Sequence, residues 1–216
     1  YWLKIKNKKL YFTLHIRTTP KSNFTSRLQA KLSSKIFHNN VFITENEKIN
    51  TQNLCKKHQL SGEVIYNSVK IRKKNKSYKL PLKILALANY SYDRGLDRII
   101  DLANAIPIEH RNKFSFLIAG DYRLPRFLPK ELRMLALQGK TLKDYAIKKN
   151  VSSMVTFLGH ISDTNKLFDN IDILIKPTRE YNPWGRDILE AIANGKAVIS
   201  VGNYDKFVNK NTGLLL

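Results

Sequence analysis

The residue types best suited to chemistry lie near the end of the chain, in Asn182-Pro-Trp-Gly-Arg-Asp-Ile-Leu-Glu190. Pro183 and Gly185 predict a break in structure, and the apolar spacing that follows predicts a short helix over 186–193 with Gly195 as its cap. The first turn of a helix presents unpaired N–H groups and the positive end of its dipole, both of which favour phosphate. This segment is therefore a candidate anion site.

Glu190 lies within the apolar run 188–193, so its carboxylate needs a partner. Arg186 stands four residues earlier on the same helix face and could form an ion pair, although this order of charges is the weaker one. Ribose hydroxyls of a bound nucleotide could instead donate hydrogen bonds to Glu190. Both explanations remain open from the residues alone.

The elements that must position this segment are short apolar runs alternating with amphipathic stretches of helical length. The runs are continuous, which is typical of strands buried on both faces of a parallel sheet. The predicted strands are 84–88, 114–119, 155–158, 173–175 and 197–201. The predicted helices are 96–105, 130–149 as two helices broken near Gly139, 165–169 and 186–194. This alternation predicts an α/β fold with a doubly wound parallel sheet.

Ligands bind beyond the carboxyl ends of the strands in such a sheet. Glycines and polar side chains follow the predicted strands at that edge, in the segments 89–95, 120–121, 159–160 and 176–182. Because glycine lets a ligand approach the backbone closely, these segments predict the ligand site.

The chain is predicted to contain a second, partial α/β unit. Strands are predicted at 10–15, 41–44 and 63–65, and helices at 27–37 and 47–58. The run Lys70–Lys79 is charged and aperiodic, which favours a solvated linker, with a basic recognition arm as the alternative. The expected organisation is a domain over 1–69, a linker over 70–82 and a domain over 83–216.

The formal charge of +21 is distributed unevenly. Residues 1–80 hold 18 Lys/Arg and 3 Asp/Glu, or +15, and the remainder holds 20 and 14, or +6. This asymmetry favours an anionic partner for the first half, such as lipid headgroups, nucleic acid or a phosphorylated acceptor. A general lysine-rich bias is the plainer explanation. The single cysteine, Cys55, excludes an internal disulfide and suits a reducing cytoplasm.

The stretch from Glu63 to Leu216 resembles the retaining glycosyltransferases of family 4, which have the two-domain GT-B fold. Motifs similar to those of the family occur in order at 64–67, 93–97, 117–121, 155–159, 172–177, 185–199 and 211–215. The resemblance implies GT-B-like Rossmann domains, with the C-terminal doubly wound parallel sheet nearly complete and the N-terminal one partial. The chain is accordingly expected to be a fragment of a longer transferase, lacking N-terminal strands and a final helix.

The resemblance implies roles only where residues match. Glu190 matches the glutamate used on the nucleotide ribose, Arg94 the cation on the donor diphosphate, and His15 the histidine of the catalytic cleft, with an ordinary strand-end histidine as the alternative. The implied donor-binding residues are Asn89, Arg94, Gly95, Gly120, His160, Ile161, Trp184, Gly185, Arg186, Asp187 and Glu190. The implied catalytic residues are His15, Asn182 and Glu180.

Two departures from the family pattern concern catalysis and phosphate binding. Asn182 stands where the family has its first glutamate, and Glu180 lies two residues too early. Asparagine can hydrogen-bond sugar hydroxyls but cannot act as a base. Asn89 stands where the family usually has arginine, so the grip on the diphosphate is expected to be weaker by about 1–3 kcal/mol.

The implied reaction is transfer of a sugar from a nucleoside-diphosphate donor with retention of configuration. No cofactor or metal is expected, because no Asp-x-Asp triplet is present and Arg94 with the helix start would neutralise the leaving diphosphate. The expected acceptor is a saccharide or lipid-linked molecule of envelope polysaccharide or glycolipid synthesis. The expected location is the cytoplasm, with peripheral contact of residues 1–80 with the anionic inner face of the membrane.

Other functions are compatible with the sequence. A homologue that binds the nucleotide sugar without turnover and a sugar-nucleotide epimerase would share the fold. A basic nucleic-acid-binding module would explain the charge of residues 1–80, but that region lacks aromatic residues at stacking intervals. No specific nucleic-acid partner is expected.

Overall fold

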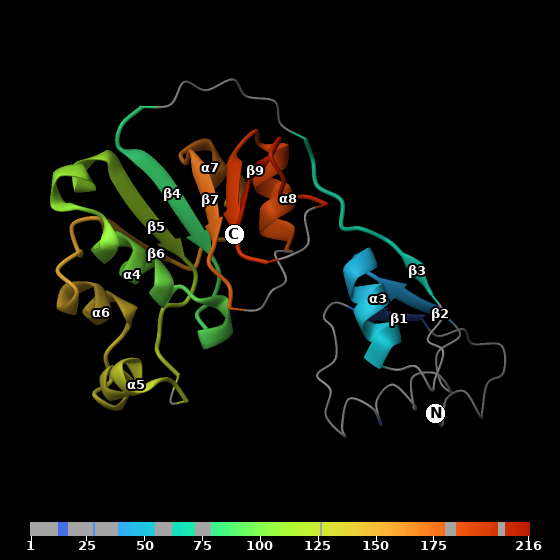
Figure 1. Cartoon of the computed structure of the whole chain (residues 1–216), viewed down its shortest axis with the longest axis horizontal. Helices are drawn as coiled ribbons and strands as arrows, with labels where there is room; N and C mark the ends of the chain where they lie inside the picture. Colours follow the sequence, from blue (N-terminus) through green and yellow to red (C-terminus); the bar gives the residue numbers. More distant parts are fainter. Residues whose placement is uncertain are drawn as a thin grey trace. The chain divides into compact units, whose positions relative to one another are not determined.

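The computed structural model describes residues 13–16, 28, 39–54, 62–71, 79–125, 127–179, 185–202 and 206–216. The chain divides into two compact units, Tyr1–Ser68 and Val69–Leu216, each of which combines helices with parallel strands (Figure 1). Each unit is described below by itself.

The first unit has a parallel sheet of order β1-β2-β3 within its described residues. The strands are β1 (Thr13–Ile16), β2 (Asn39–Phe42) and β3 (Glu63–Val64), and helix α3 (Glu45–Leu54) follows β2. Thr44 caps α3, because its hydroxyl accepts a hydrogen bond from the Glu47 N–H at 3.1 Å. The strands predicted at 41–44 and 63–65 are confirmed with shifted ends, whereas the predicted helix over 27–37 falls outside the described residues apart from Leu28.

The second unit contains a sheet of six parallel strands in the order β6-β5-β4-β7-β8-β9. Its strands are β4 (Leu82–Leu87), β5 (Phe114–Ala119), β6 (Val155–Gly159), β7 (Ile173–Lys176), β8 (Ala197–Ser200) and β9 (Gly213–Leu215). The predicted α/β class and parallel sheet are confirmed. The sequence pattern does not predict β9, because three residues after a glycine turn carry too short an apolar signal.

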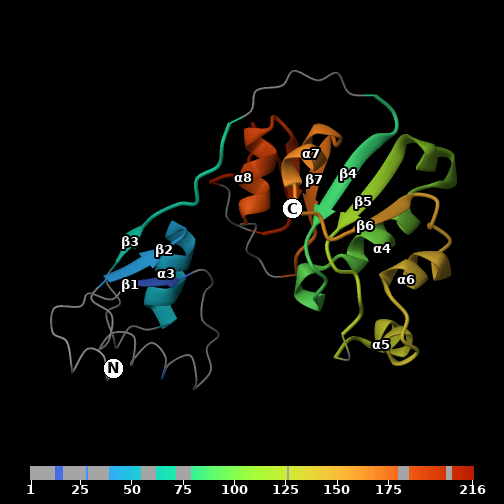
Figure 2. The same cartoon turned by 180° about the vertical axis from the view of Figure 1, so that it is seen from behind.

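Helices cover both faces of this sheet (Figures 1 and 2). One face carries α4 (Asp97–Ala105) and α6 (Leu142–Lys148), and the other carries α7 (Thr164–Asp169) and α8 (Arg186–Ala193). Helix α5 (Lys130–Leu137) packs against α6. Side chains of β4 alternate between the two cores: Ile84 and Ala86 face the α4 side, and Leu85 faces the α7–α8 side. A strand buried on both faces explains its continuous apolar sequence.

The predicted break near Gly139 is also confirmed. α5 ends before Gly139, whose φ of 70° is left-handed, and α6 begins after Thr141. Thr141 and Asp144 form a reciprocal capping box, in which the Thr141 hydroxyl accepts from the Lys143 N–H and the Asp144 carboxylate accepts from the Thr141 N–H. Within the described residues no helix is both long and apolar enough to cross a membrane.

Candidate donor site at the switch point

The strand order of the second unit places a topological switch point between β4 and β7. From β4 the chain continues outward through β5 and β6, and it then crosses back to β7 and continues outward on the other side. Connections leave the carboxyl ends of β4 and β7 in opposite directions, which opens a crevice for a ligand in doubly wound folds. The segments that follow β4 and β7 are therefore the first place to look for a site.

The segment after β4 forms a tight turn that carries Arg94. The 3-10 helix η2 (Tyr92–Arg94) ends at Gly95, which has a left-handed φ of 68°. A Cβ on Gly95 would lie 2.2 Å from the carbonyl oxygen of Pro177, just beyond β7. Glycine at position 95 thus lets the two segments touch, and it leaves Arg94 exposed at the switch point.

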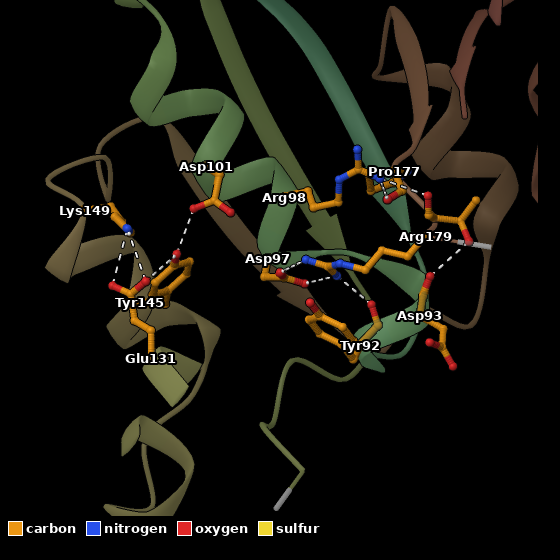
Figure 3. Close-up of polar contacts among 11 residues, drawn as sticks. Tyr92, Asp93, Asp97, Arg98, Asp101, Glu131, Tyr145, Lys149, Pro177 and Arg179 are labelled. Atoms are coloured by element: carbon orange, nitrogen blue, oxygen red, sulfur yellow. Dashed lines mark hydrogen bonds and ion pairs between the residues drawn. The ribbon is translucent and has the colours of Figure 1, made fainter. Parts of the chain in front are cut away.

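Arg179 fastens the segment after β7 to the segment after β4 (Figure 3). Its guanidinium pairs with both carboxylate oxygens of Asp97, the first residue of α4, and donates to the Tyr92 carbonyl at 2.6 Å. It also lies 3.8 Å from the centre of the Tyr92 ring. Its backbone N–H donates to the carbonyl of Asp93 at 2.8 Å. Hydrogen bonding to Asp97 raises the pKa of Arg179 above its ordinary value.

Two further contacts reinforce this junction. Arg98 donates to the carbonyls of Pro177 and Thr178, each at 3.0 Å, and the Thr178 hydroxyl donates to the Asp93 carbonyl at 3.0 Å. Tyr90 lies beside them, and burial, followed by the charge of Asp97, raises the pKa of its hydroxyl well above the ordinary value. The junction is therefore held by several charge-assisted hydrogen bonds to backbone carbonyls.

The start of α8 carries a lysine–aspartate pair that is largely buried. Lys176, the last residue of β7, places its Nζ 3.0 Å from Oδ1 of Asp187. A Cβ on Gly185 would lie 2.1 Å from both of these atoms, so the glycine admits the pair against the backbone before the helix. A cation and the first turn of a helix are thus adjacent at this edge of the sheet.

Glu190 has the intrahelical partner that the spacing allowed. Its Oε1 lies 2.9 Å from Nε of Arg186, which is largely exposed, and its Oε2 lies 3.5 Å from the Thr164 hydroxyl at the start of α7. The ion pair accounts for the carboxylate without a ligand. It also leaves the ribose interpretation intact, because the Arg186 side chain is 71% exposed and can move away from Glu190 when a ligand binds.

The end of β5 is tied to the end of β4 by backbone contacts around Gly120. A Cβ there would lie 2.1 Å from the Ala88 carbonyl oxygen, and φ at Gly120 is 123°. The Asn89 side-chain oxygen accepts a hydrogen bond from the Asp121 N–H at 2.9 Å. Asn89 was predicted to contact the nucleotide-sugar donor. In the structure its side-chain oxygen is bound to the Asp121 backbone. A hydrogen bond from Arg123 lowers the pKa of Asp121.

The remaining predicted residues fall in different surroundings. His160, after β6, is exposed, whereas the side chain of Ile161 packs against the core on the α7–α8 face. His15 lies in β1, in register with Val41, and its side chain is outside what the structure describes. Glu180, Asn182 and Trp184 are outside the described residues.

Sequence reasoning missed three residues of this edge: Asp97, Lys176 and Arg179. Asp97 and Lys176 lie in the motifs 93–97 and 172–177, which were recognised as a whole without a role for either residue. Arg179 lies in the segment 176–182 predicted at the ligand edge, but its role had no local signal, because its partners lie in the segment from Tyr92 to Asp97. The strand order brings the two segments together.

The fold and this edge define a Rossmann-like α/β unit with cations at its switch point. Residues 67–215 match the sequence model of the family Glycosyl transferases group 1, and the chain belongs to this family. A comparison with curated protein sequences finds no match.

Several solved structures share the fold. HepE of Anabaena, solved with UDP-glucose, superposes with a TM-score of 0.70 at 18% identity over 94% of this chain and 58% of HepE. The pneumococcal O-GlcNAc transferase GtfA, solved with UDP and GlcNAc, gives 0.73 at 12% identity over 99% of this chain and 42% of GtfA. TarM gives 0.71 at 17% identity over 97% of this chain and 41% of TarM. The chain therefore spans less than two-thirds of the length of each.

Proposed function

We propose that this chain is the donor-binding part of a glycosyltransferase that transfers a sugar from a nucleoside diphosphate with retention of configuration. The observation that carries the proposal is the junction at the switch point, where the turn bearing Arg94 is fastened to the segment that leads from β7 toward α8. Membership of the family Glycosyl transferases group 1 supports a glycosyltransferase, and ligands of doubly wound folds bind at this edge.

In this proposal Arg94 and the first turn of α8 share the charge of the diphosphate. Arg94 is exposed and has no ion-pair partner among the described residues, so it is available to a ligand. Its planar guanidinium can hold two phosphate oxygens at once. Lys176 lies close to Gly185, where its ion pair with Asp187 holds it beside the first turn of α8.

Glu190 would exchange part of its contact with Arg186 for the ribose hydroxyls. A carboxylate accepts hydrogen bonds from both hydroxyls of a ribose, which a phosphate site alone could not recognise. The neighbouring loop at His160 and Ile161 would meet the base. UDP is the first nucleotide to test, because HepE and GtfA were solved with UDP or a UDP-sugar.

The proposed acceptor is a saccharide or lipid-linked molecule of envelope polysaccharide or glycolipid synthesis. The reaction is proposed to need no cofactor or metal, because Arg94 and the first turn of α8 would carry the charge of the diphosphate. Peripheral contact of the basic residues 1–80 with an anionic inner membrane face also belongs to this proposal.

A thermal-shift series with UDP, GDP, ADP and CMP, each beside its nucleoside, tests donor binding. A nucleotide present at 100 times its Kd raises the free energy of unfolding by about 2.7 kcal/mol, and a nucleoside at the same concentration, without phosphates, should raise it less. The proposal predicts one base that stabilises the chain strongly as the diphosphate. No stabilisation by any nucleotide would contradict it.

Turnover needs a separate test. Asn182 stands where the family has its first glutamate, so the chain could be a homologue that binds the nucleotide sugar without transferring it. Incubating the chain with the preferred nucleotide sugar and a saccharide acceptor, and reading the anomeric configuration of the product by NMR, tests transfer and retention together. Binding without product would favour the silent homologue.

A further inference from the structure

Residues 124–140 form an excursion beyond the sheet of the second unit. Backbone pairing between Arg123 and Thr141 closes the base of the excursion, and the Leu142 N–H donates to the Tyr122 carbonyl at 3.1 Å. α5 lies inside it, and both views show α5 on the arrowhead side of β4 and β5 (Figures 1 and 2). The excursion therefore stands at the same edge of the sheet as the candidate donor site.

The outward face of α5 combines large apolar side chains with cations. Lys130, Arg133, Met134 and Leu137 fall within an arc of about 100° at 3.6 residues per turn. Leu132 and Leu135 lie on the opposite face and are buried in the core. Met134 is 52% exposed and Leu137 is 64% exposed, so this face is not used by the unit itself.

Phe127 extends the apolar surface just before α5 and is 96% exposed. Single apolar residues on a surface are normal and need no explanation. The set Phe127, Met134 and Leu137 differs because all three lie on one excursion, and Met134 and Leu137 share a helix face with cations.

The charge of the excursion is one-sided. Residues 124–140 contain four Lys/Arg and one Asp/Glu, giving +3. The acidic residue, Glu131, lies 3.0 Å from Lys148, the last residue of α6, and 3.3 Å from Lys149, and both lysines are outside the excursion. Among the residues with described contacts, Lys130, Arg133 and Lys140 have no ion-pair partner. The cations on α5 are thus available to an anionic surface.

We propose that the excursion at 124–140 is a docking surface for an anionic lipid bilayer. Aromatic and aliphatic side chains enter the boundary between headgroups and acyl chains, while flanking Lys and Arg stay with the anionic headgroups. Nucleic acid would satisfy the cations, but the aliphatic Met134 and Leu137 offer no ring for a base to stack on. A bilayer satisfies both components of the surface.

This placement has a consequence for an acceptor carried by the membrane. Because the excursion and the switch point occupy the same edge of the sheet, docking would hold the donor edge toward the bilayer. The inference stands on α5 alone and does not depend on which nucleotide the chain binds.

Co-sedimentation of the full chain with vesicles tests the proposal. We expect binding to phosphatidylcholine vesicles that contain phosphatidylglycerol, and weak binding to vesicles of phosphatidylcholine alone. The double variant K130E/R133E should lower the partition coefficient at least about 30-fold, since each cation near an anionic surface contributes roughly a factor of five. The triple variant F127S/M134S/L137S should also lower it at least tenfold, and the loss should persist at high salt.

Matched controls come from η3 (Ile108–Lys113), which precedes β5 and so lies at the opposite edge of the sheet. Ile108 is 81% exposed, so I108S removes a comparable apolar side chain, and K113E reverses a comparable charge. Both should bind vesicles as the parent does. Phe127→Trp should in addition show a blue-shifted emission increment with anionic vesicles, and Ile108→Trp should not.

Three results would overturn the proposal. Equal losses in the α5 and η3 variants would show unspecific attraction, and undiminished binding by the α5 variants would assign the membrane contact to residues 1–80. Self-association that disappears in F127S/M134S/L137S, without any vesicle binding, would assign the surface to a second copy of the chain. All variants should keep the thermal shift that the nucleotide gives the parent. A failure of the membrane proposal can therefore be told apart from a failure of the proposed donor site.

Discussion

Arg179 forms a two-pronged ion pair with Asp97 across the switch point, from the segment after β7 to the first residue of α4. The carboxylate is buried, and the guanidinium also lies over the ring of Tyr92. This pair joins the two chain segments that diverge at the switch point. It therefore both stabilises the second unit and fixes the place of Arg94.

Removing the arginine alone should be strongly destabilising. Arg179→Ala leaves the Asp97 carboxylate buried without its main partner, which should lower the free energy of unfolding by about 3 kcal/mol. Replacing both residues, as in Asp97→Leu/Arg179→Met, should recover part of the loss, with a coupling of about 1–3 kcal/mol. Urea unfolding followed by circular dichroism measures each value.

Arg111 provides a matched arginine. It donates to the carbonyls of Ile106, Asn150 and Asn104 at 3.1–3.2 Å and has no carboxylate partner among the described residues. Arg111→Ala should therefore cost only about 1 kcal/mol, because water can replace the lost donors. Equal losses for Arg111→Ala and Arg179→Ala would remove the buried carboxylate from the explanation.

Gly120→Ala should be severely destabilising. The added Cβ would meet the Ala88 carbonyl at 2.1 Å, and both atoms belong to rigid strand ends, so we expect a loss of at least about 3 kcal/mol. Gly139 has a left-handed φ of 70°, but a Cβ at this position would have nothing within 4 Å, so Gly139→Ala should cost about 1 kcal/mol. Thermal unfolding of the two variants separates the clash with the Ala88 carbonyl from the cost of the backbone conformation. A similar loss of stability in both variants would refute the close approach of Gly120 to the end of β4.

The capping box of α6 should make stability depend on pH. Hydrogen bonding to the Thr141 backbone lowers the pKa of Asp144 below its usual 3.8, so the carboxylate contributes stability above that value and loses it as the pH falls through the lower, folded-state pKa. The advantage of the parent over Asp144→Ala should be constant near neutral pH and shrink below about pH 3.8. Thr141→Ala should cost about 1 kcal/mol at pH 7. Urea unfolding from pH 3 to pH 7 measures the free energy of unfolding of the parent and of Asp144→Ala, and each unit by which the pKa is lowered corresponds to about 1.4 kcal/mol. A difference between the two proteins that does not change with pH would exclude the ionised cap.

Arg94→Ala should separate the diphosphate from the nucleoside. Loss of a charge-assisted contact should weaken the binding of UDP by about 2 kcal/mol, or roughly 30-fold, and leave the binding of uridine nearly unchanged. Arg133→Ala removes an exposed arginine from α5 and should change neither affinity. Equal weakening of UDP and uridine by Arg94→Ala would take Arg94 out of the phosphate position.

Most of the second unit could be predicted from the sequence because its signals are local. Strands buried on both faces give continuous apolar runs, and the helix break at Gly139 can be predicted from the residues next to it in the sequence. β9 gave no such signal, because Gly213–Leu215 is a strand only through its pairing with β8. Tertiary pairing, which a local pattern does not contain, decides such short elements.

The candidate site was predicted less completely for the same reason. Gly95, Gly120 and Gly185 were recognised from the turns they make, and each proves to admit a close approach. Arg179 and Asp97 are 82 residues apart, and only the strand order joins them. The contact of the Asn89 side-chain oxygen with the Asp121 N–H becomes visible only when β4 and β5 are paired, and the ligand role of Asn89 stays a prediction.

Calorimetric titration of Glu190→Ala with UDP, or with whichever nucleotide stabilises the parent, tests the central claim most directly. The Arg186–Glu190 ion pair is worth only about 0–1 kcal/mol to the fold, so the variant should unfold near the parent temperature. Glu131→Ala, which also removes a paired carboxylate, is the control and should bind normally. The account predicts that Glu190→Ala loses nucleotide binding while it stays folded; unchanged affinity in this variant would contradict it.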